Sequence, residues 1–428
     1  MRTEGTVFRN NILFRQLVCA TFISSLGDWI NSIAVLTLVL SITHSSFAVG
    51  ATLAMRVLPY IIAGPIGGVF SDRVRRTRVM IACDLIRSVL ALGFLLVSRQ
   101  EDMWLVYTLT ISLVFFSAFF SPTRSAYMAS IVETTDIGTA SSILAGLNGI
   151  VMVLGFSLGG ISVAELGTSV SFVINAFSFI LSAYFLLNGA HKETGRNGDS
   201  VVFNWASEDN HGNRSKEVTG FWKSFKMGLN EIRRNTPVAY VIYLFMGWSV
   251  GGGAINVLIS VMADQAYGMG SKGLGLLYAS LGFGMIVGSL STVRLFKPNL
   301  EQMQAVVGLT FVLDALFQIL FVNSPVYIGA VLALIGAGFA SALSNTMETT
   351  ILASLTPNEL QGRVFSVSDT LSSSFLGISM MFSGMLTQKM GYQCVGTLGA
   401  AIILGFGLHY TLLYGIYKRK IDRSNKCT

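Results

Sequence analysis

Six ionisable side chains interrupt long apolar stretches of this sequence: Asp28, Arg56, Asp84, Arg87, Asp314 and Asp369. An ionised group at the centre of a bilayer costs at least about 2.5–3.5 kcal/mol on insertion scales, so each one inside an apolar segment calls for a role. In spanning proteins such groups carry protons, bind ions or charged substrates, or form ion pairs. The chemistry that these residues predict is therefore movement of protons or ions, not bond-making catalysis.

Asp28 and Arg56 lie at similar depths in two consecutive apolar segments. Asp28 is about 15 residues into the first segment, and Arg56 is about 16 residues from the inner end of the second, so both lie roughly 22–24 Å from the same membrane edge. We predict that Asp28 is the proton-coupling carboxylate and that Arg56 is its counter-charge. The alternatives are a structural ion pair, or a carboxylate hydrogen-bonded to Ser24, Ser25 or Asn31.

The other four ionisable positions differ in depth. Asp84 and Arg87 are three residues apart, which allows them to pair along one helical face. They lie nearer the end of their segment that is expected to be cytoplasmic, which favours an inner-gate or architectural role. Asp369 is close enough to its segment end to be wetted, and Asp314 is deeper.

The composition requires a membrane. The 428 residues are 52% hydrophobic and only 12% charged, with a mean hydropathy of +0.63, whereas soluble proteins usually carry roughly 25% charged residues. The four cysteines are scattered without the spacing of a metal site or a disulfide framework. We see no phosphate-binding glycine loop and no Ser-His-Asp set, so we predict neither an enzyme nor a cofactor or metal.

Twelve segments are long enough to cross a bilayer, each with about 20 apolar residues. They are residues 13–40, 46–71, 79–98, 103–121, 140–163, 169–189, 237–263, 273–293, 303–322, 325–347, 364–387 and 392–416. This pattern predicts an N-terminal six-helix bundle (1–190), a cytoplasmic linker (191–236) and a C-terminal six-helix bundle (237–428). Within the linker, apolar residues recur on one helical face between Thr219 and Arg234, which predicts an amphipathic helix at the membrane surface or on the bundle.

The positive charge orients these segments. Of the 29 Lys and Arg residues, only Arg99, Lys272 and Lys389 fall in the loops of one side, and Arg56 and Arg87 lie inside segments. The rest mark the opposite side as cytoplasmic under the positive-inside rule, which places both termini in the cytoplasm. The net charge of +7 is thereby accounted for without a nucleic-acid partner.

A loop motif between the second and third segments carries a family resemblance. It runs Gly64-Pro-Ile-Gly-Gly-Val-Phe-Ser-Asp-Arg-Val-Arg-Arg-Thr-Arg78 and joins two apolar runs. It resembles the hallmark loop between helices 2 and 3 of the major facilitator superfamily of secondary transporters. Gly68, Asp72, Arg73 and Arg76 fall on that motif, whereas Arg75 stands where the general pattern has glycine. This departure, with Leu58-Pro59-Tyr60 and Gly64-Pro65, looks like the macrolide-efflux-like drug:proton antiporter branch.

Two further stretches are similar to that branch. Pro357-Asn-Glu-Leu-Gln-Gly-Arg-Val-Phe-Ser366 looks like its entry into helix 11, and Ser121-Pro122-Thr123-Arg124 looks like the N-terminal partner. In the fifth segment, Gly155, Gly159 and Gly160 resemble the helix 5 motif of drug antiporters. Phe156 replaces the proline of that motif, so the kink that the proline would cause is not implied here.

The resemblance implies an all-α integral membrane protein with twelve transmembrane helices in two six-helix bundles. It further implies a secondary transporter that exports an amphipathic or lipophilic, drug-like molecule by proton antiport through alternating access. The inner gate would then comprise the motif residues together with Asp84, Arg87, Arg124, Gly362 and Arg363. In this fold the ninth helix is usually peripheral, which argues against a transport role for Asp314.

Aromatic, amide and methionine side chains suit an apolar cavity wall for a drug-like substrate: Phe22, Trp29, Asn31, Tyr243, Trp248, Asn256, Phe375 and Met380. The alternative is that they pack in the core or face lipid. The expected partners are a small-molecule substrate, protons and the bilayer of the plasma membrane, and the expected oligomeric state is a monomer. The rival functions are a lysolipid flippase, an uptake symporter, or a membrane sensor of the same fold that transports nothing.

Overall fold

The computed structural model describes residues 11–61, 75–197, 218–295 and 300–426, and throughout these ranges the regular elements are helices. The chain divides into two compact units. The first combines Met1–Ile42 with Leu58–Gly220, and the second combines Thr43–Val57 with Phe221–Thr428. The all-α class predicted from the sequence is therefore confirmed.

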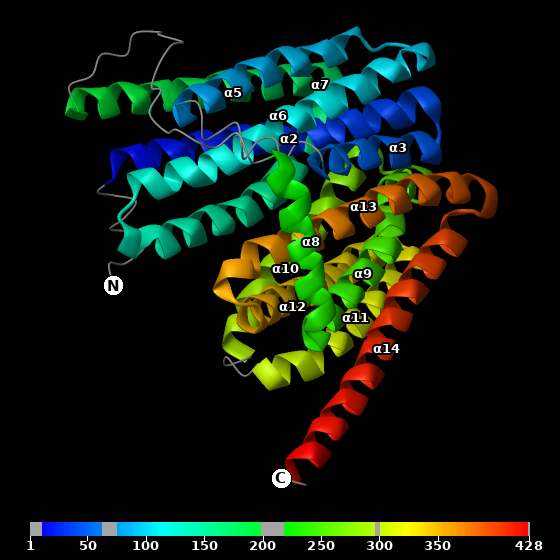
Figure 1. Ribbon diagram of the computed structural model, residues 1–428. Coiled ribbons are helices and arrows are strands. Elements are labelled where there is room, and N and C mark those ends of the chain that lie inside the picture. Colours follow the sequence, from blue (N-terminus) through cyan, green and yellow to red (C-terminus); the bar gives the residue numbers. More distant parts are fainter. Residues whose placement is uncertain (1–10, 62–74, 198–217, 296–299, 427–428) are drawn as a thin grey trace. The chain divides into compact units, whose positions relative to one another are not determined.

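Four long helices form the first unit: α2 (Ile12–Thr43), α5 (Arg76–Gly93), α6 (Met103–Ile131) and α7 (Ile137–Asn197). Short turns of 3₁₀ helix lie between α5 and α6, η1 (Phe94–Leu96) and η2 (Gln100–Asp102), and between α6 and α7, η3 (Thr134–Asp136). Within this unit α5 packs along both α6 and α7 (Figure 1). Phe14, Leu17 and Met80 are fully buried and form part of its apolar core.

The helix α7 contains two crossings, because the chain turns at Gly167. This glycine has a φ of 85°, in the left-handed region that side chains disfavour. The hydroxyls of Ser162 and Ser171 are hydrogen-bonded at 2.9 Å across it. Nine residues of continuous helix would rise about 13.5 Å, so this bond requires the chain to fold back at the glycine. The predicted fifth and sixth segments thus form an antiparallel pair.

The second unit contains the remaining helices: α3 (Ser46–Val57), α8 (Val218–Arg234), α9 (Thr236–Val261), η4 (Met262–Ala266), α10 (Gly270–Leu295), α11 (Leu300–Val322), α12 (Tyr327–Leu355), α13 (Asn358–Met390) and α14 (Tyr392–Lys426). Successive neighbours in space are α10, α12, α11, α14, α9, α13 and α3.

Between α8 and α9, Asn235 caps the start of α9 through a hydrogen bond from the Val238 amide to its side chain. Pro237 occupies the first turn of α9, where a missing N–H does no harm.

The helix α3 packs closely on α13 through two glycines. A Cβ atom on Gly50 would lie 2.4 Å from the Met380 carbonyl oxygen, and one on Gly384 would lie 2.5 Å from the Ser46 carbonyl oxygen. At the same end, the Gln388 amide donates a hydrogen bond to the Ser45 hydroxyl. The sequence prediction assigned residues 46–71 to the N-terminal bundle, whereas residues 43–57 group with the second unit.

A side chain at position 384 should therefore separate α3 from α13. We expect Gly384→Leu to lower the stability of the purified protein by about 1–3 kcal/mol, the usual range for overpacking. Thermal unfolding in detergent measures this effect. The control is Gly405→Leu on α14, where a Cβ atom meets nothing within 4 Å. Equal unfolding temperatures for the two variants would show that the close approach is not needed.

The amphipathic helix predicted in the linker is present as α8. Ile232 is buried, and Phe225 and Leu229 pack against the apolar core of the second unit. Gly228 allows the close contact, because a Cβ atom there would lie 2.7 Å from the Arg363 carbonyl oxygen at the start of α13. The apolar face of α8 thus lies on the bundle of the second unit.

Within the described ranges, nine helices are long and apolar enough to cross a membrane: α2, α5, α6, α7, α9, α10, α11, α12 and α14. The turn at Gly167 makes α7 two crossings. The helix α3 is apolar but short as described, and α13 is interrupted by serines and Asp369. Counting these two, the helices match the twelve predicted segments.

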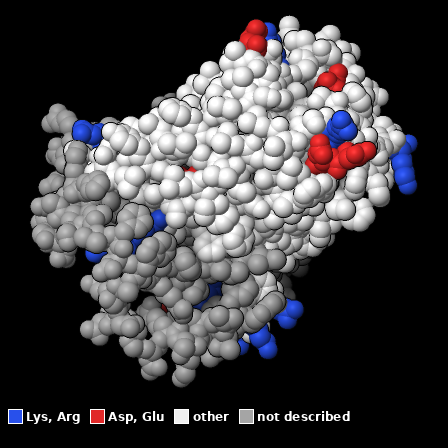
Figure 2. All heavy atoms as spheres, turned by 90° about the horizontal axis from the view of Figure 1, so that it is seen from above, with Lys and Arg blue, Asp and Glu red and all other residues white. Residues whose placement is uncertain are grey.

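The outer surface of the first unit has the character of a lipid-facing wall. Large apolar side chains are highly exposed on α5 and α7, among them Val89 (71%) and Phe177 (61%). Figure 2 shows a broad uncharged face with its visible charges near the margins. Such a surface would be insoluble in water and is suited to hydrocarbon.

Candidate transport site

Three helices of the first unit bring two carboxylates to one arginine. Arg87 on α5 forms ion pairs with Asp28 of α2, through Nη2, and with Asp84 on its own helix, where Nη1 lies 3.2 Å from Oδ1. Ser182 of α7 donates a hydrogen bond of 2.6 Å to the other oxygen of Asp84. We call Asp28, Asp84, Arg87 and Ser182 the charge cluster.

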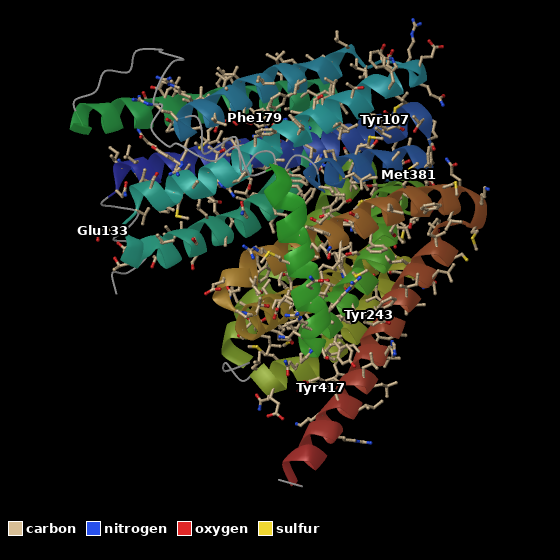
Figure 3. The ribbon with its side chains drawn as sticks, viewed as in Figure 1. Tyr107, Glu133, Phe179, Tyr243, Met381 and Tyr417 are labelled. Carbon is tan, nitrogen blue, oxygen red and sulfur yellow. The ribbon has the colours of Figure 1, made fainter. Side chains whose placement is uncertain are left out.

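Aromatic rings complete the surroundings of the guanidinium. The Arg87 Cζ atom lies 4.1 Å from the ring centroid of Phe179, which Figure 3 labels on α7, and 5.7 Å from that of Phe120. A cation over an aromatic face is stabilised by the ring quadrupole, more so when water is excluded. These contacts fix the guanidinium between the two carboxylates.

Burial distinguishes the two carboxylates. The Asp84 side chain is 0% exposed and that of Arg87 is 3% exposed, whereas the Asp28 side chain is 36% exposed. When both carboxylates are ionised, one guanidinium leaves the cluster with one negative charge in excess. An added proton or a cationic group would balance that charge, and Asp28 is the carboxylate that such a partner could reach.

The charge cluster belongs to a longer polar seam between α2 and the second crossing of α7. On α2 the polar residues are Thr21, Ser24, Asp28 and Asn31, and on α7 they are Ser171, Asn175, Ser178 and Ser182. Both sets recur at intervals of three or four residues, so each lies on one helical face. Gly27 lets the two faces meet, because a Cβ atom there would lie 2.0 Å from Ser178 Oγ.

Sequence reasoning did not identify the α7 face of this seam. The signal was present as a run of small polar residues at helical spacing inside an apolar segment, all of them at most 7% exposed in the structure. Polar side chains turned toward one another are favoured inside a membrane bundle because lipid offers no hydrogen bonds.

The glycines of the antiporter-like motif position α2 against the first crossing of α7. A Cβ atom on Gly155 would lie 2.5 Å from the Cβ of Trp29, and one on Gly159 would lie 3.0 Å from the Cα of Ile30. Phe156, at the position of the missing proline, packs on Trp29 with ring centroids 4.7 Å apart. The motif therefore acts here as a packing surface for the residues that flank Asp28.

We expect Gly155→Leu to displace α2 and with it Asp28. The collision with Trp29 should destabilise the protein by about 1–3 kcal/mol, and export should fall with it. The control is Gly146→Leu on the same helix, where a Cβ atom meets nothing within 4 Å and the gain in helix propensity is the same. Thermal unfolding and export are measured on both variants. Equal stability and equal export in Gly155→Leu and Gly146→Leu would show that the contact with Trp29 does not position α2.

Asp28 has a partner that the sequence did not suggest. It forms an ion pair with Arg87, because depth along a helix does not determine which way a side chain points. Arg56 lies on α3 in the second unit, where its charge acts on Tyr278 of α10. A pair between Asp28 and Arg56 stays a prediction. The predicted pair of Asp84 and Arg87 is present, and it is joined to Asp28.

The predicted inner-gate residues lie in several places. Gly68, Asp72 and Arg73 are outside the described residues. Arg76 donates a hydrogen bond of 3.0 Å to the Ala126 carbonyl, tying α5 to α6, and Arg363 contacts Met227 of α8 through its guanidinium. Arg124 lies in the C-terminal part of α6, and Gly362 is the fifth residue of α13. Their joint action as a gate stays a prediction.

The predicted cavity residues are divided between the units, with Phe22, Trp29 and Asn31 on α2, Tyr243, Trp248 and Asn256 on α9, and Phe375 and Met380 on α13. Several of them make intramolecular contacts. The Tyr243 hydroxyl is hydrogen-bonded to His409 at 2.9 Å, and Asn256 donates to the Gly252 carbonyl. Their role in substrate binding stays a prediction. In the part of the chain that the structure describes, no cluster of His, Cys, Asp or Glu could hold a metal ion.

Comparison with known proteins decides the family. Residues 17–379 match the family model described as Major Facilitator Superfamily. The chain belongs to the major facilitator superfamily. It is therefore a multi-pass membrane transporter rather than an enzyme, as the loop motif implied.

Among superfamily relatives, the chain is 23% identical over 414 residues to the "Putative bacilysin exporter BacE" of Bacillus subtilis (strain 168), covering 96% of each chain. It is 23% identical over 425 residues to the "Enterobactin exporter EntS" of Salmonella typhimurium, covering 97% of this chain and 95% of the relative. A shorter match, 32% identical, covers 43% of the uncharacterized MFS-type transporter YfiS of Bacillus subtilis. The macrolide-efflux branch stays a prediction.

Solved structures show the same fold. A peptide transporter POT in complex with alafosfalin superposes with a TM-score of 0.72 at 12% identity, covering 98% of this chain and 99% of the other. The nucleoside transporter NupG gives a TM-score of 0.68 at 14% identity, with 94% and 99% coverage. At these identities the likeness concerns the fold alone.

Proposed function

We propose that the protein exports an amphipathic or lipophilic small molecule in exchange for protons, and that Asp28 is the residue at which proton and substrate compete. The observation that carries this proposal is the excess carboxylate of the charge cluster, which is the more exposed of the two. The exporter relatives support the direction of transport.

The proton would bind to a carboxylate oxygen of Asp28. Asp84 and Arg87 then remain a neutral pair, held by Ser182 and by the ring of Phe179. When Asp28 releases its proton, the cluster regains its excess negative charge. That state favours a substrate with a positively charged or hydrogen-bond-donating group.

Competition at Asp28 is sufficient to couple the binding of the proton to the binding of the substrate. A substrate that binds the ionised cluster and a proton that neutralises it exclude each other, which is antiport by thermodynamic linkage. Alternating exposure of the cluster to the two sides of the membrane would complete the cycle, as in other transporters with sites between two repeats. The energy source is then the proton gradient.

Inside-out membrane vesicles test the proposal. Bacilysin, enterobactin, a macrolide and a lysophospholipid are offered to vesicles with and without the protein while a proton gradient is imposed. We expect uphill accumulation of at least one compound, and its loss when a protonophore collapses the gradient. Accumulation that survives the protonophore but needs sodium would contradict proton antiport, and binding without accumulation would indicate a sensor.

A further inference from the structure

A second buried carboxylate lies in the other unit, where the proposed coupling does not use it. Asp314 of α11 is 1% exposed, and both of its oxygens accept hydrogen bonds. Trp248 of α9 donates from Nε1 to Oδ2 at 3.0 Å, and Gln318 donates from Nε2 to Oδ1 at 2.9 Å. Ser341 of α12 is a further hydrogen-bonding neighbour.

All these donors are neutral. The titratable groups among the described side chains of the helices packed against α11 lie on three helices and on α11 itself. They are Tyr240 and Tyr243 on α9, Tyr327 and Glu348 on α12, Tyr392, Cys394, His409, Tyr410, Tyr414, Tyr417, Lys418 and Arg419 on α14, and Glu301 on α11. Among the described residues, none of these acts on the Asp314 carboxylate, whose neighbours are Trp248, Gln318 and Ser341. Asp84 in the first unit has Arg87, whereas no cation among the described residues acts on Asp314.

A carboxylate held only by neutral donors keeps its full negative charge in surroundings of low dielectric constant, which is costly unless a proton neutralises it. A second observation also indicates that a proton binds here. Gln318 is 4% exposed, and its Oε1 has no hydrogen-bond partner among the described residues. An unpaired acceptor thus lies on the amide that already contacts the carboxylate.

The two observations fit one exchange of hydrogen bonds. When Asp314 is ionised, the Gln318 amide donates to Oδ1. When Oδ1 carries a proton, rotation of the amide by half a turn presents Oε1 as the acceptor of that proton. The two amide orientations have nearly the same shape, so the site accommodates either state without repacking.

We propose that Asp314 and Gln318 form a reversible proton-binding site in the second unit and that its occupancy sets the position of Trp248. A hydrogen bond to a charged acceptor is roughly twice as strong as one between neutral groups. Protonation of Asp314 therefore weakens the bond from the Trp248 indole. Gly252 leaves room beside the ring, since a Cβ atom there would lie 3.4 Å from it.

Tryptophan fluorescence tests this inference without any transport assay. The chain has five tryptophans, so a variant that keeps only Trp248, with Phe at positions 29, 104, 205 and 222, reports on this site alone. We expect its emission to follow a single titration between about pH 5 and about pH 9, the range accessible to a perturbed carboxyl group. The titration should be lost in Asp314→Asn, which mimics the neutral form.

Asp28→Asn in the same background is the matched control. It should retain the titration, which separates this inference from the proposed role of the charge cluster. Emission that does not change with pH, or a titration that persists in Asp314→Asn, would overturn the proposal. Should Asp314→Asn fail to fold, Asp314→Glu serves instead. A shifted midpoint, with a shifted carboxylic acid C=O stretch in the infrared, supports the site, and an unchanged midpoint refutes it.

Discussion

Asp28→Asn should strongly reduce export driven by a proton gradient while leaving downhill exchange of substrate. Asparagine keeps the size of the side chain but can neither release a proton nor carry the excess charge of the cluster. Arg87 and Asp84 then form a permanently neutral pair, equivalent to the protonated state. Because coupling energies between two ligands are typically 1–3 kcal/mol, we expect uphill accumulation to fall about 5- to 150-fold.

The measurement is uphill accumulation and counterflow in the same vesicles, with Asp264→Asn as the control. Asp264 is an exposed carboxylate in η4, so its loss changes the net charge equally without touching the cluster. Asp28→Glu should retain some coupling, since it keeps an ionisable group. Wild-type accumulation by Asp28→Asn, with the same pH dependence, would remove Asp28 from the mechanism.

Arg87→Met should destabilise the protein more than any other single change in the cluster. The side chain is 3% exposed and faces the buried Asp84 and the partly exposed Asp28, and both carboxylates would be left without a cation. Removing one partner of a buried ion pair typically costs about 3–5 kcal/mol. Loss of the contact with Phe179 adds to the effect. Thermal unfolding in detergent should show a large decrease, and export should be lost.

A double variant separates charge from packing. Arg87→Met combined with Asp84→Asn removes one charge of each sign, so only the partly exposed Asp28 remains. We expect this double variant to recover most of the stability that Arg87→Met loses, because the uncompensated buried carboxylate is gone. If the double variant is less stable than Arg87→Met alone, the electrostatic account of the cluster fails.

The sequence predicted those features that depend on distance along the chain. Apolar length located the twelve crossings, helical spacing paired Asp84 with Arg87, and the amphipathic pattern located α8. The contacts that Asp84 and Asp314 make with distant segments were not predicted. Ser182 bonds to Asp84 across 98 positions and Trp248 to Asp314 across 66, and such contacts depend on how each helix is rotated about its axis.

Helix rotation also determines two contacts that depth and helix order could not predict. Depth alone suggested Arg56 as the counter-charge of Asp28, which stays a prediction, and the faces of α2 and α5 that meet place Arg87 beside Asp28. The Asp314 side chain on α11 is turned toward Trp248 of α9. The small polar residues on the second crossing of α7 would have indicated the buried face of that helix, since Ser and Asn inside an apolar segment turn toward protein.

The most direct test of proton antiport at Asp28 is the pH inside proteoliposomes during substrate entry. Purified wild-type and Asp28→Asn proteins are reconstituted with a pH-sensitive dye in the lumen and no imposed gradient, and a compound that the vesicle assay identifies is added outside. The account predicts that substrate entry makes the wild-type lumen alkaline, as protons leave in exchange, and that Asp28→Asn moves substrate without this change. Substrate entry into wild-type proteoliposomes with no change in lumen pH, or with acidification, would contradict it.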